Sequence, residues 1–367
     1  MPTAFSKNST RNYGVDALRI ISSIMIVMIH VLGQGGILNA SRNLSVRGEV
    51  MWVLQIGCLC FVNVFALISG YVGFGSKHKL SGILNLWLQV FMYGIISTVL
   101  ILALRKEPFS MSLMLKTLFP IITEENWYFT AYFALFFFMP LLDALVDNVS
   151  ANKMRICLLA SSVLFMIVET VRSVDVFGVS AGYSVIWLAL MYVIGAYVKK
   201  YDPLSKLKLW HCGVGFLICM LLTFAARIII EIATLKLLGE ASHGTKFITY
   251  TSPIMVLQAL FALQAFCMIK IPKVTEGIIK FFTPMTFGVF IIHTTTMAYR
   301  YGLHNAFSFV QSYPLIGVLG ISIGATLAIW LVCSLLDYVR ILIFKLLGIF
   351  KLTNWIGYTT EDLLGKL

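Results

Sequence analysis

The chain has 367 residues, of which 59% are hydrophobic and only 12% are charged. Soluble domains contain about 45–50% apolar residues, so this composition excludes an ordinary soluble protein and indicates an integral membrane protein. The net charge of +12 comes from basic residues dispersed over many short loops, and they form no patch or module that would bind nucleic acid.

Ten apolar runs are each long enough to cross a hydrocarbon core of about 30 Å. The first run follows a polar, basic leader and is full length, so we interpret it as a retained span rather than a cleaved signal peptide. We expect an all-α polytopic protein with about ten transmembrane helices, forming a single membrane domain over 1–367. The predicted spans are 18–38, 50–73, 83–104, 127–146, 154–171, 183–198, 209–233, 252–270, 282–301 and 315–347.

Two segments differ from simple spans or loops. The gap at 105–126 contains "FSMSLMLKTLFPII", which is typical of a re-entrant or surface-lying segment. At the end of the last run, "YVRILIFKLLGIFKL" places Arg340, Lys345 and Lys351 among apolar residues. We therefore expect the last span to continue as an interfacial amphipathic helix.

The loops differ in their content of lysine and arginine. If the N-terminus is cytoplasmic, the inner segments carry 18 of these residues and the outer segments carry 9. Because basic residues are enriched in cytoplasmic loops, this bias predicts that both termini are cytoplasmic.

The cysteines indicate neither a disulfide framework nor a metal site. Six of the seven lie inside apolar runs. Cys58 and Cys60 are two residues apart, so on a helix they point about 200° apart, and no histidine or carboxylate is near them in the sequence. We therefore expect no metal in this protein.

The first span contains three ionisable residues on one face. Arg19 and His30 are eleven residues apart, which places them within about 20° of each other and about 16 Å apart along a helix. Asp16 lies three residues before Arg19, at the cytoplasmic end. Ionisable groups within a membrane are costly and usually functional. The alternative is that Arg19 is a topology anchor and His30 a hydrogen-bonded interior histidine.

Other ionisable residues lie in or near later spans. His293 is in the ninth span and is followed by three threonines, so it is either functional or a packing donor. Glu169 and Arg172 lie near the outer end of the fifth span, and Arg227 and Glu231 lie one turn apart near the outer end of the seventh. A structural ion pair is the alternative for Arg227 and Glu231.

Several motifs in order resemble a known family. Arg19 is followed after ten residues by His30, behind the lead "YGVDALRI", and "FALISGYVGF" (65–74), "NWYFTAYFALFFFMPLL" (126–142) and "FGVFIIH" (287–293) come later. This set is similar to acyltransferase family 3, whose integral membrane members O-acetylate bacterial surface polysaccharides and related acceptors. The likeness covers nearly the whole chain.

One element of the family pattern differs. Many members have an arginine-rich cluster ending in proline after the Ser-Gly-aromatic element, whereas here the loop reads "GSKHKLSG". Lysine can attract a phosphate as a point charge but lacks the planar fork of arginine.

The resemblance implies a set of site residues and substrates. The donor is expected to be acetyl-CoA or another acyl-CoA, with no permanently bound cofactor. The acceptor is expected to be a surface glycan, a lipid-linked sugar or another hydroxyl compound at the cell membrane. His30 would act as general base or acyl-relay nucleophile. The remaining implied residues are His293 as a second catalytic candidate, Arg19, Asp16, Lys77, Lys79 and Ser69 for the donor, and Glu169, Arg172, Arg227 and Glu231 for the acceptor.

A transporter or exporter of a small polar molecule, such as an amino acid, is the alternative function. His30, His293 and the outer ion pairs would then be substrate or proton sites. A saturable thioester-cleaving activity would distinguish the enzyme from the transporter.

Overall fold

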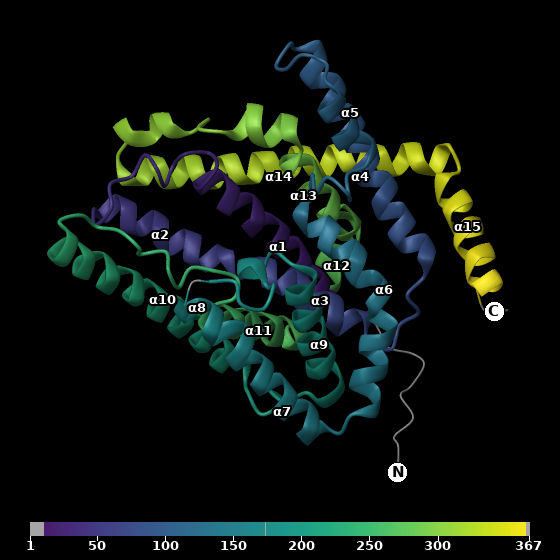
Figure 1. Cartoon of the computed structure of the whole chain (residues 1–367), viewed down its shortest axis with the longest axis horizontal. Coiled ribbons are helices and arrows are strands. Elements are labelled where there is room, and N and C mark those ends of the chain that lie inside the picture. The colour runs from purple at the N-terminus through teal and green to yellow at the C-terminus, as the bar shows by residue number, and fades with distance from the viewer. Residues whose placement is uncertain (1–10, 173, 365–367) are drawn as a thin grey trace.

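The computed structural model describes residues 11–172 and 174–364, and the described chain is helical without any strand. Figure 1 shows the helices and the course of the chain. The α-helices are α1 (Tyr13–Leu32), α2 (Val46–Leu59), α3 (Phe61–Gly73), α4 (Leu80–Ala103), α5 (Met111–Leu118), α6 (Trp127–Asn148), α7 (Ala151–Ser162), α8 (Glu169–Arg172), α9 (Val185–Tyr201), α10 (Leu209–Leu238), α11 (Pro253–Met268), α12 (Lys273–Phe282), α13 (Thr286–Thr294), α14 (Leu315–Leu346) and α15 (Ile349–Leu364). The short π- and 3₁₀-segments are η1 (Val163–Val168), η2 (Ser180–Gly182), η3 (Thr283–Met285), η4 (Met297–Leu303) and η5 (Ser308–Ser312).

A helix lies at the place of every predicted span, which confirms an all-α polytopic membrane protein. Within the described residues, 8 helices are long and apolar enough to cross a membrane. The other two predicted spans coincide with α9, of 17 residues, and α11, of 16 residues. The eight longer ones are Tyr13–Leu32, Val46–Gly73, Leu80–Ala103, Trp127–Asn148, Ala151–Arg172, Leu209–Leu238, Lys273–Thr294 and Leu315–Leu346.

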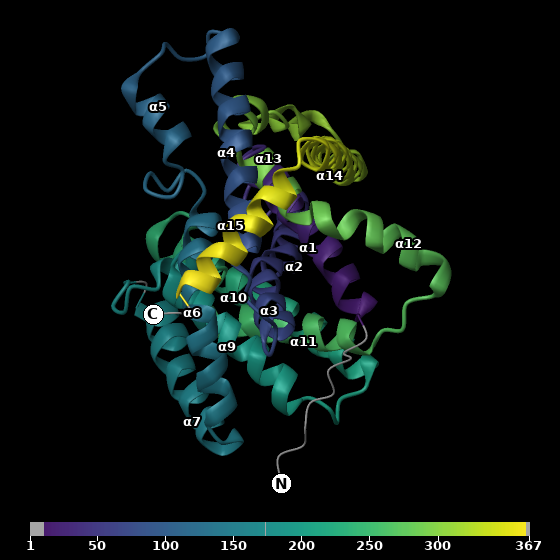
Figure 2. The ribbon, with the colours of Figure 1, turned by 90° about the vertical axis from the view of Figure 1, so that its right-hand side faces the viewer.

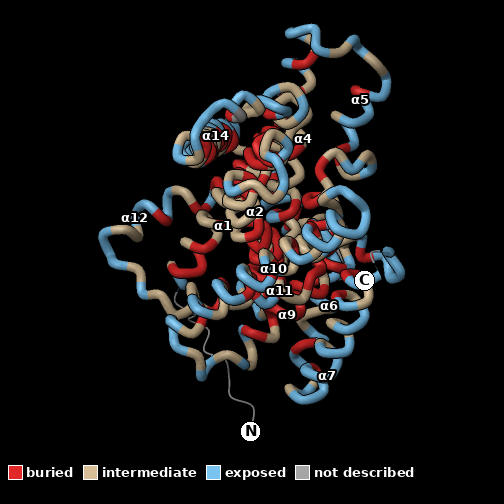
Figure 3. Tube along the Cα trace, turned by 90° about the vertical axis from the view of Figure 1, so that its left-hand side faces the viewer, coloured by how far each residue is buried: buried red, intermediate tan, exposed pale blue. Residues whose placement is uncertain are grey.

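Helix α1 lies inside the bundle. It packs against α2, α3, α11, α12, α13 and α14. In Figure 3 the buried segments gather around α1 and α9, whereas α5 and α7 are mostly exposed. Because several helices cover α1, the polar side chains along this helix face protein rather than lipid.

The first helix ends earlier than predicted. Asn12 caps its start by accepting hydrogen bonds from the amides of Gly14 and Val15. The helix stops at Leu32 rather than at residue 38, and the chain turns through Gly36, whose φ of +86° favours glycine. His30, which is near the middle of the predicted span 18–38, therefore occupies the last turn of α1.

The C-terminal region also differs from the sequence prediction. Arg340 does not lie at an interface but is buried, and it pairs with Asp337 on α14 at 2.8 Å. The chain then turns at Gly348, with φ +69°, into the separate helix α15, which packs against α4. Figure 2 shows α15 crossing the end of the bundle while α14 is seen end-on. Lys345 lies in the last turn of α14.

The segment at 105–126 forms the short helix α5. It packs against α4 near one end of the bundle, where Figure 1 shows it projecting away from the other helices. Most of its residues are exposed, so of the two sequence alternatives the structure favours the surface-lying segment.

The orientation remains a prediction, which accessibility labelling can test. The terminal residues 1–10 and 365–367, with the counted Lys7 and Lys366, lie outside the described residues. In a Cys157→Ser background, a cysteine at Ser205 should be labelled only from inside and one at Ser242 only from outside. Membrane-impermeant maleimide on intact and permeabilised cells measures this. The reverse pattern would contradict the orientation. Below, "inner" is the side where α1 begins and "outer" the side where it ends.

Candidate active site

Two histidines far apart in the sequence meet at the outer ends of two helices. His30 lies in the last turn of α1 and His293 in the last turn of α13. His30 Nδ1 and His293 Nε2 are 2.8 Å apart. His293 is buried, whereas His30 is partly exposed. The two candidate catalytic residues from the sequence therefore form one pair.

A backbone carbonyl fixes the direction of hydrogen bonding through this pair. His293 Nδ1 lies 2.6 Å from the carbonyl oxygen of Val289, which can only accept. In neutral His293, Nδ1 therefore carries the proton and Nε2 is an acceptor. His30 must then donate from its Nδ1 to His293. This leaves the lone pair of His30 on Nε2, free to accept a proton.

The predicted ninth span, 282–301, is not one continuous helix. Helix α13 ends at Thr294, and Thr295 has an extended ψ of 149° before the chain continues as η4. The amide of Met297 donates a hydrogen bond to the Ser97 hydroxyl of α4, at 3.0 Å. The break places His293 at a helix end, and Thr294 and Thr296 contact Asn126 and Glu125, just before α6.

A cavity of about 410 Å³ lies beside His30. Its wall is largely aromatic, and the imidazole of His30 is the only basic group among the lining residues. Such a cavity suits an apolar group delivered to the imidazole. The lining residues are Ile26, His30, Val62, Phe65, Trp127, Tyr128, Tyr250, Phe287 and Phe290.

Helices α1, α3 and α6 continue from this cavity toward the inner side. Each lines the cavity with two residues and places a further polar residue one or more turns away: Arg19 on α1, Ser69 on α3 and Tyr132 on α6. Tyr132 lies close enough to interact with both Arg19 and Ser69. Tyr132 also stacks on Tyr128, with ring centroids 6.3 Å apart. Tyr132, Tyr128 and Ser69 therefore lie between Arg19 and the cavity at His30, and Arg19 and His30 are about 16 Å apart along α1.

An acidic residue, Asp16, lies at the start of α1, at the inner end of the face that carries Arg19. Asp16 is buried and contacts two arginines, Arg11 at 2.5 Å and Arg19 at 3.4 Å. Asp16 therefore orients Arg19 and offsets part of the positive charge, rather than contacting an anion directly.

The loop with Lys77 and Lys79 is tied to α6 by a carboxylate that sequence reasoning missed. Asp143 accepts from His78 Nε2 at 2.9 Å and from the Tyr192 hydroxyl at 2.7 Å. Both lysines are exposed, so their ammonium groups are accessible from the inner side. A lone carboxylate inside the fourth predicted span was the available signal for Asp143, because such groups are rarely left unpaired in membranes.

The four outer residues predicted to bind the acceptor lie in two separate places. Arg227 pairs with Glu231 at 2.5 Å and with Glu49 at 3.4 Å, and its side chain is 0% exposed. Glu169 instead accepts from the amide of Ala181 at 3.0 Å. Arg172 is exposed. The burial of Arg227 and Glu231 favours the structural ion pair that the sequence left open.

Comparison with known proteins identifies the family of the chain. The family model described as "Acyltransferase domain", that of acyltransferase family 3, matches residues 12–335. A search of curated proteins and a search of solved structures each found no match. The matched region contains the histidine pair, the cavity and the path to Arg19. The chain therefore belongs to acyltransferase family 3 and is a membrane acyltransferase.

Proposed function

We propose that the protein transfers an acyl group, assigned as acetyl, from cytoplasmic acyl-CoA to a hydroxyl of a cell-surface glycan or related acceptor outside the plasma membrane. The single observation that carries this proposal is the free Nε2 of His30 at the aromatic cavity, with Arg19 at the inner end of the same helix face. No observation favours the transporter alternative.

The acyl group in this proposal is acetyl, and the reaction needs one proton acceptor and one proton donor. As the acceptor oxygen attacks the thioester carbonyl, its proton moves to His30 Nε2, the carbon–sulfur bond breaks, and the proton passes to the CoA sulfur. His293 and the Val289 carbonyl stabilise the transient imidazolium by accepting along the chain of hydrogen bonds. Both histidines also lie at helix C-termini, where the helix dipole favours a cation.

The donor is proposed to bind from the inner side. Arg19 would contact its phosphates, with Lys77 and Lys79 adding positive charge at the mouth. Ser69 lies beside the path, and Asp16 orients Arg19. The pantetheine arm would then follow the face that connects Arg19 with the cavity, so that the thioester reaches His30.

Replacing Arg19 with alanine is expected to raise the KM for acetyl-CoA about tenfold while changing kcat less, because the guanidinium contacts the donor far from the reacting carbonyl. Steady-state thiol release by reconstituted protein measures this. Lys153→Ala removes an exposed inner charge away from the path and serves as the control. A fall in kcat with an unchanged KM would contradict the assignment.

The proposed function is tested with the protein in liposomes. Acetyl-CoA is added on the inner-face side and thiol release is followed with and without hydroxyl acceptors on the other side. Saturable thiol release that increases with an acceptor, together with an acetylated product, supports the proposal. Movement of a solute across the membrane without thioester cleavage would support the transporter instead.

A further inference from the structure

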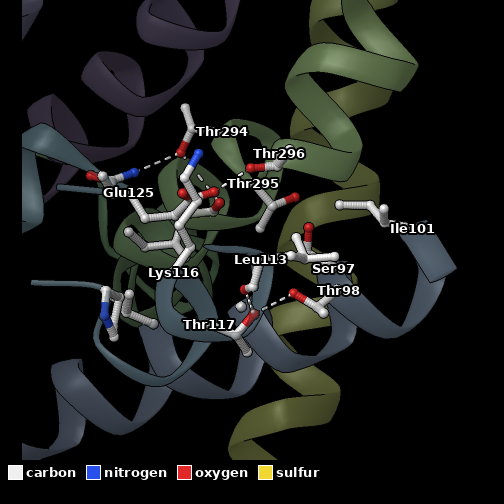
Figure 4. A pocket seen from close by; sticks show the side chains of 15 residues that line it. Ser97, Thr98, Ile101, Leu113, Lys116, Thr117, Glu125, Thr294, Thr295 and Thr296 are labelled. Atoms are coloured by element: carbon white, nitrogen blue, oxygen red, sulfur yellow. Dashed lines mark hydrogen bonds between the residues drawn. The ribbon is translucent and has the colours of Figure 1, made fainter. Parts of the chain in front are cut away.

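A second cavity, of about 470 Å³, lies on the other side of the His293 helix end. It is formed by the outer part of α4, by α5, by the residues before α6, and by the break after α13 (Figure 4). By helix succession all these segments lie on the outer side, the same side as the ends of α1 and α13. The cavity therefore opens where an extracytoplasmic molecule would arrive.

The threonine hydroxyl groups in this cavity donate their protons to other groups of the protein. Thr117 donates to the Leu113 carbonyl at 2.8 Å, so Thr98, 2.6 Å from Thr117, donates to Thr117 in turn. Thr294 and Thr295 donate to carbonyls within α13 in the same way. These hydroxyls can therefore act toward a ligand as hydrogen-bond acceptors, through their oxygen lone pairs.

A carboxylate adds further hydrogen-bond acceptors to the cavity. Thr296 donates to Oε1 of Glu125, which leaves Oε2 of Glu125 available. Figure 4 shows Glu125 and the threonines facing a common space, with Lys116 at its edge. Lys116 is the one charged donor among the lining residues, and it balances the charge of Glu125. A ligand must therefore be close to neutral and rich in hydrogen-bond donors, which excludes a phosphate group and suits several hydroxyls.

The helix break supports a polar occupant independently. Non-helical backbone within a membrane span is stable only where protein or a polar cavity satisfies its groups. Here the non-helical residue Thr295 lines the cavity. Discontinuous helices of this kind form substrate sites in other membrane proteins.

A thin wall separates this cavity from the one at His30. Asn126 and Thr294 line the polar cavity, and a chain neighbour of each lies on the other side: Trp127 lines the cavity at His30, and His293 contacts His30. The Asn126 amide donates to the Thr294 hydroxyl at 2.9 Å. This hydrogen bond joins the two segments that lie between the polar cavity and the histidine pair.

We propose that this polar cavity binds a neutral sugar ring of the acceptor through hydroxyl groups that donate to Thr98 and Glu125. The assignment of the bound sugar as acceptor rests on the proposed acyl transfer. Opening of the Asn126–Thr294 bond then admits one sugar hydroxyl to His30.

Binding is tested by cysteine protection, which needs no catalysis. In the Cys157→Ser background, Thr98→Cys is modified by a small water-soluble thiosulfonate, and Lys106→Cys, on the same side outside the cavity, is the control. Methyl glucoside should slow modification at Thr98→Cys several-fold and leave Lys106→Cys unchanged, whereas glucose 6-phosphate should not protect. Equal rates with and without methyl glucoside, or protection by glucose 6-phosphate alone, would overturn the proposal.

The role of the site is tested by kinetics. Thr98→Val keeps the shape of the side chain but removes its oxygen, so we expect the KM for a sugar acceptor to rise about tenfold. Thr123→Val, in the loop before α6 but outside the cavity, is the matched control. Unchanged acceptor KM in a folded Thr98→Val protein would overturn the acceptor role. If wild-type protein acetylates no hydroxyl while methyl glucoside still protects Thr98→Cys, the proposed transfer fails and the sugar site stands.

Discussion

Replacing His30 with alanine is expected to lower acyl transfer by about 10²–10⁴-fold, because the proton acceptor for the attacking hydroxyl is lost. The cavity that opens is small and the side chain is only partly buried, so the fold should persist. Thiol release and acetylated product, measured on protein with a wild-type thermal unfolding midpoint, test this. Near-normal activity would refute the assignment of His30 as the base.

His293→Ala, measured side by side, separates the two histidines. His293 acts through His30 by accepting its Nδ1 proton, so its loss should reduce the rate less than the loss of His30. It should also shift the pH profile of kcat, which a purely packing role would not do. Loss of activity in His293→Ala alone would move the catalytic role to α13.

Removing Arg340 is expected to destabilise the protein by about 3–5 kcal/mol, because it leaves a buried carboxylate without its counter-charge. Asp337 is 0% exposed and accepts from Gln89 and Tyr93 at 2.8 Å as well as from Arg340. The two neutral donors both bind Oδ1 and do not balance the charge, whereas Oδ2 accepts from Arg340. Unfolding of Arg340→Met in mixed micelles measures the loss.

Two further variants make this prediction specific. Adding Asp337→Asn to Arg340→Met removes the uncompensated charge and should recover most of the stability, which a double-mutant cycle reports. Lys280→Met breaks an exposed pair with Glu276, 3.6 Å long, and should cost less than about 1 kcal/mol. Equal losses for the buried and exposed pairs would contradict the argument.

The sequence predicted the spans and the shared face of Arg19 and His30 because both depend on local periodicity. Hydrophobic length locates a helix in a membrane, and 3.6 residues per turn fix which side chains share a side. The pair of Asp337 and Arg340 was visible in the same way, at a spacing of three, but the basic C-terminal pattern resembled an interfacial helix.

The contacts of the site could not be predicted from the sequence. His30 meets His293, and Asn126 meets Thr294, only because α1, α6 and α13 pack with their outer ends together. A single sequence contains no signal for such register between distant helices. The early end of α1 depends likewise on Gly36 in the following turn, where an apolar run conceals the helix boundary.

The common face of Arg19 and His30 on α1 has a consequence for donor selection. A continuous helix is stiff, so the backbone positions of Arg19 and His30 are separated by a fixed length of about 16 Å along the axis. This length selects the donor. A thioester whose phosphate and sulfur are further apart or closer together can contact either Arg19 or His30, but not both. Truncated thioesters that lack the phosphate should therefore saturate poorly in the wild type, and lengthening α1 by a full turn would favour donors with a longer arm.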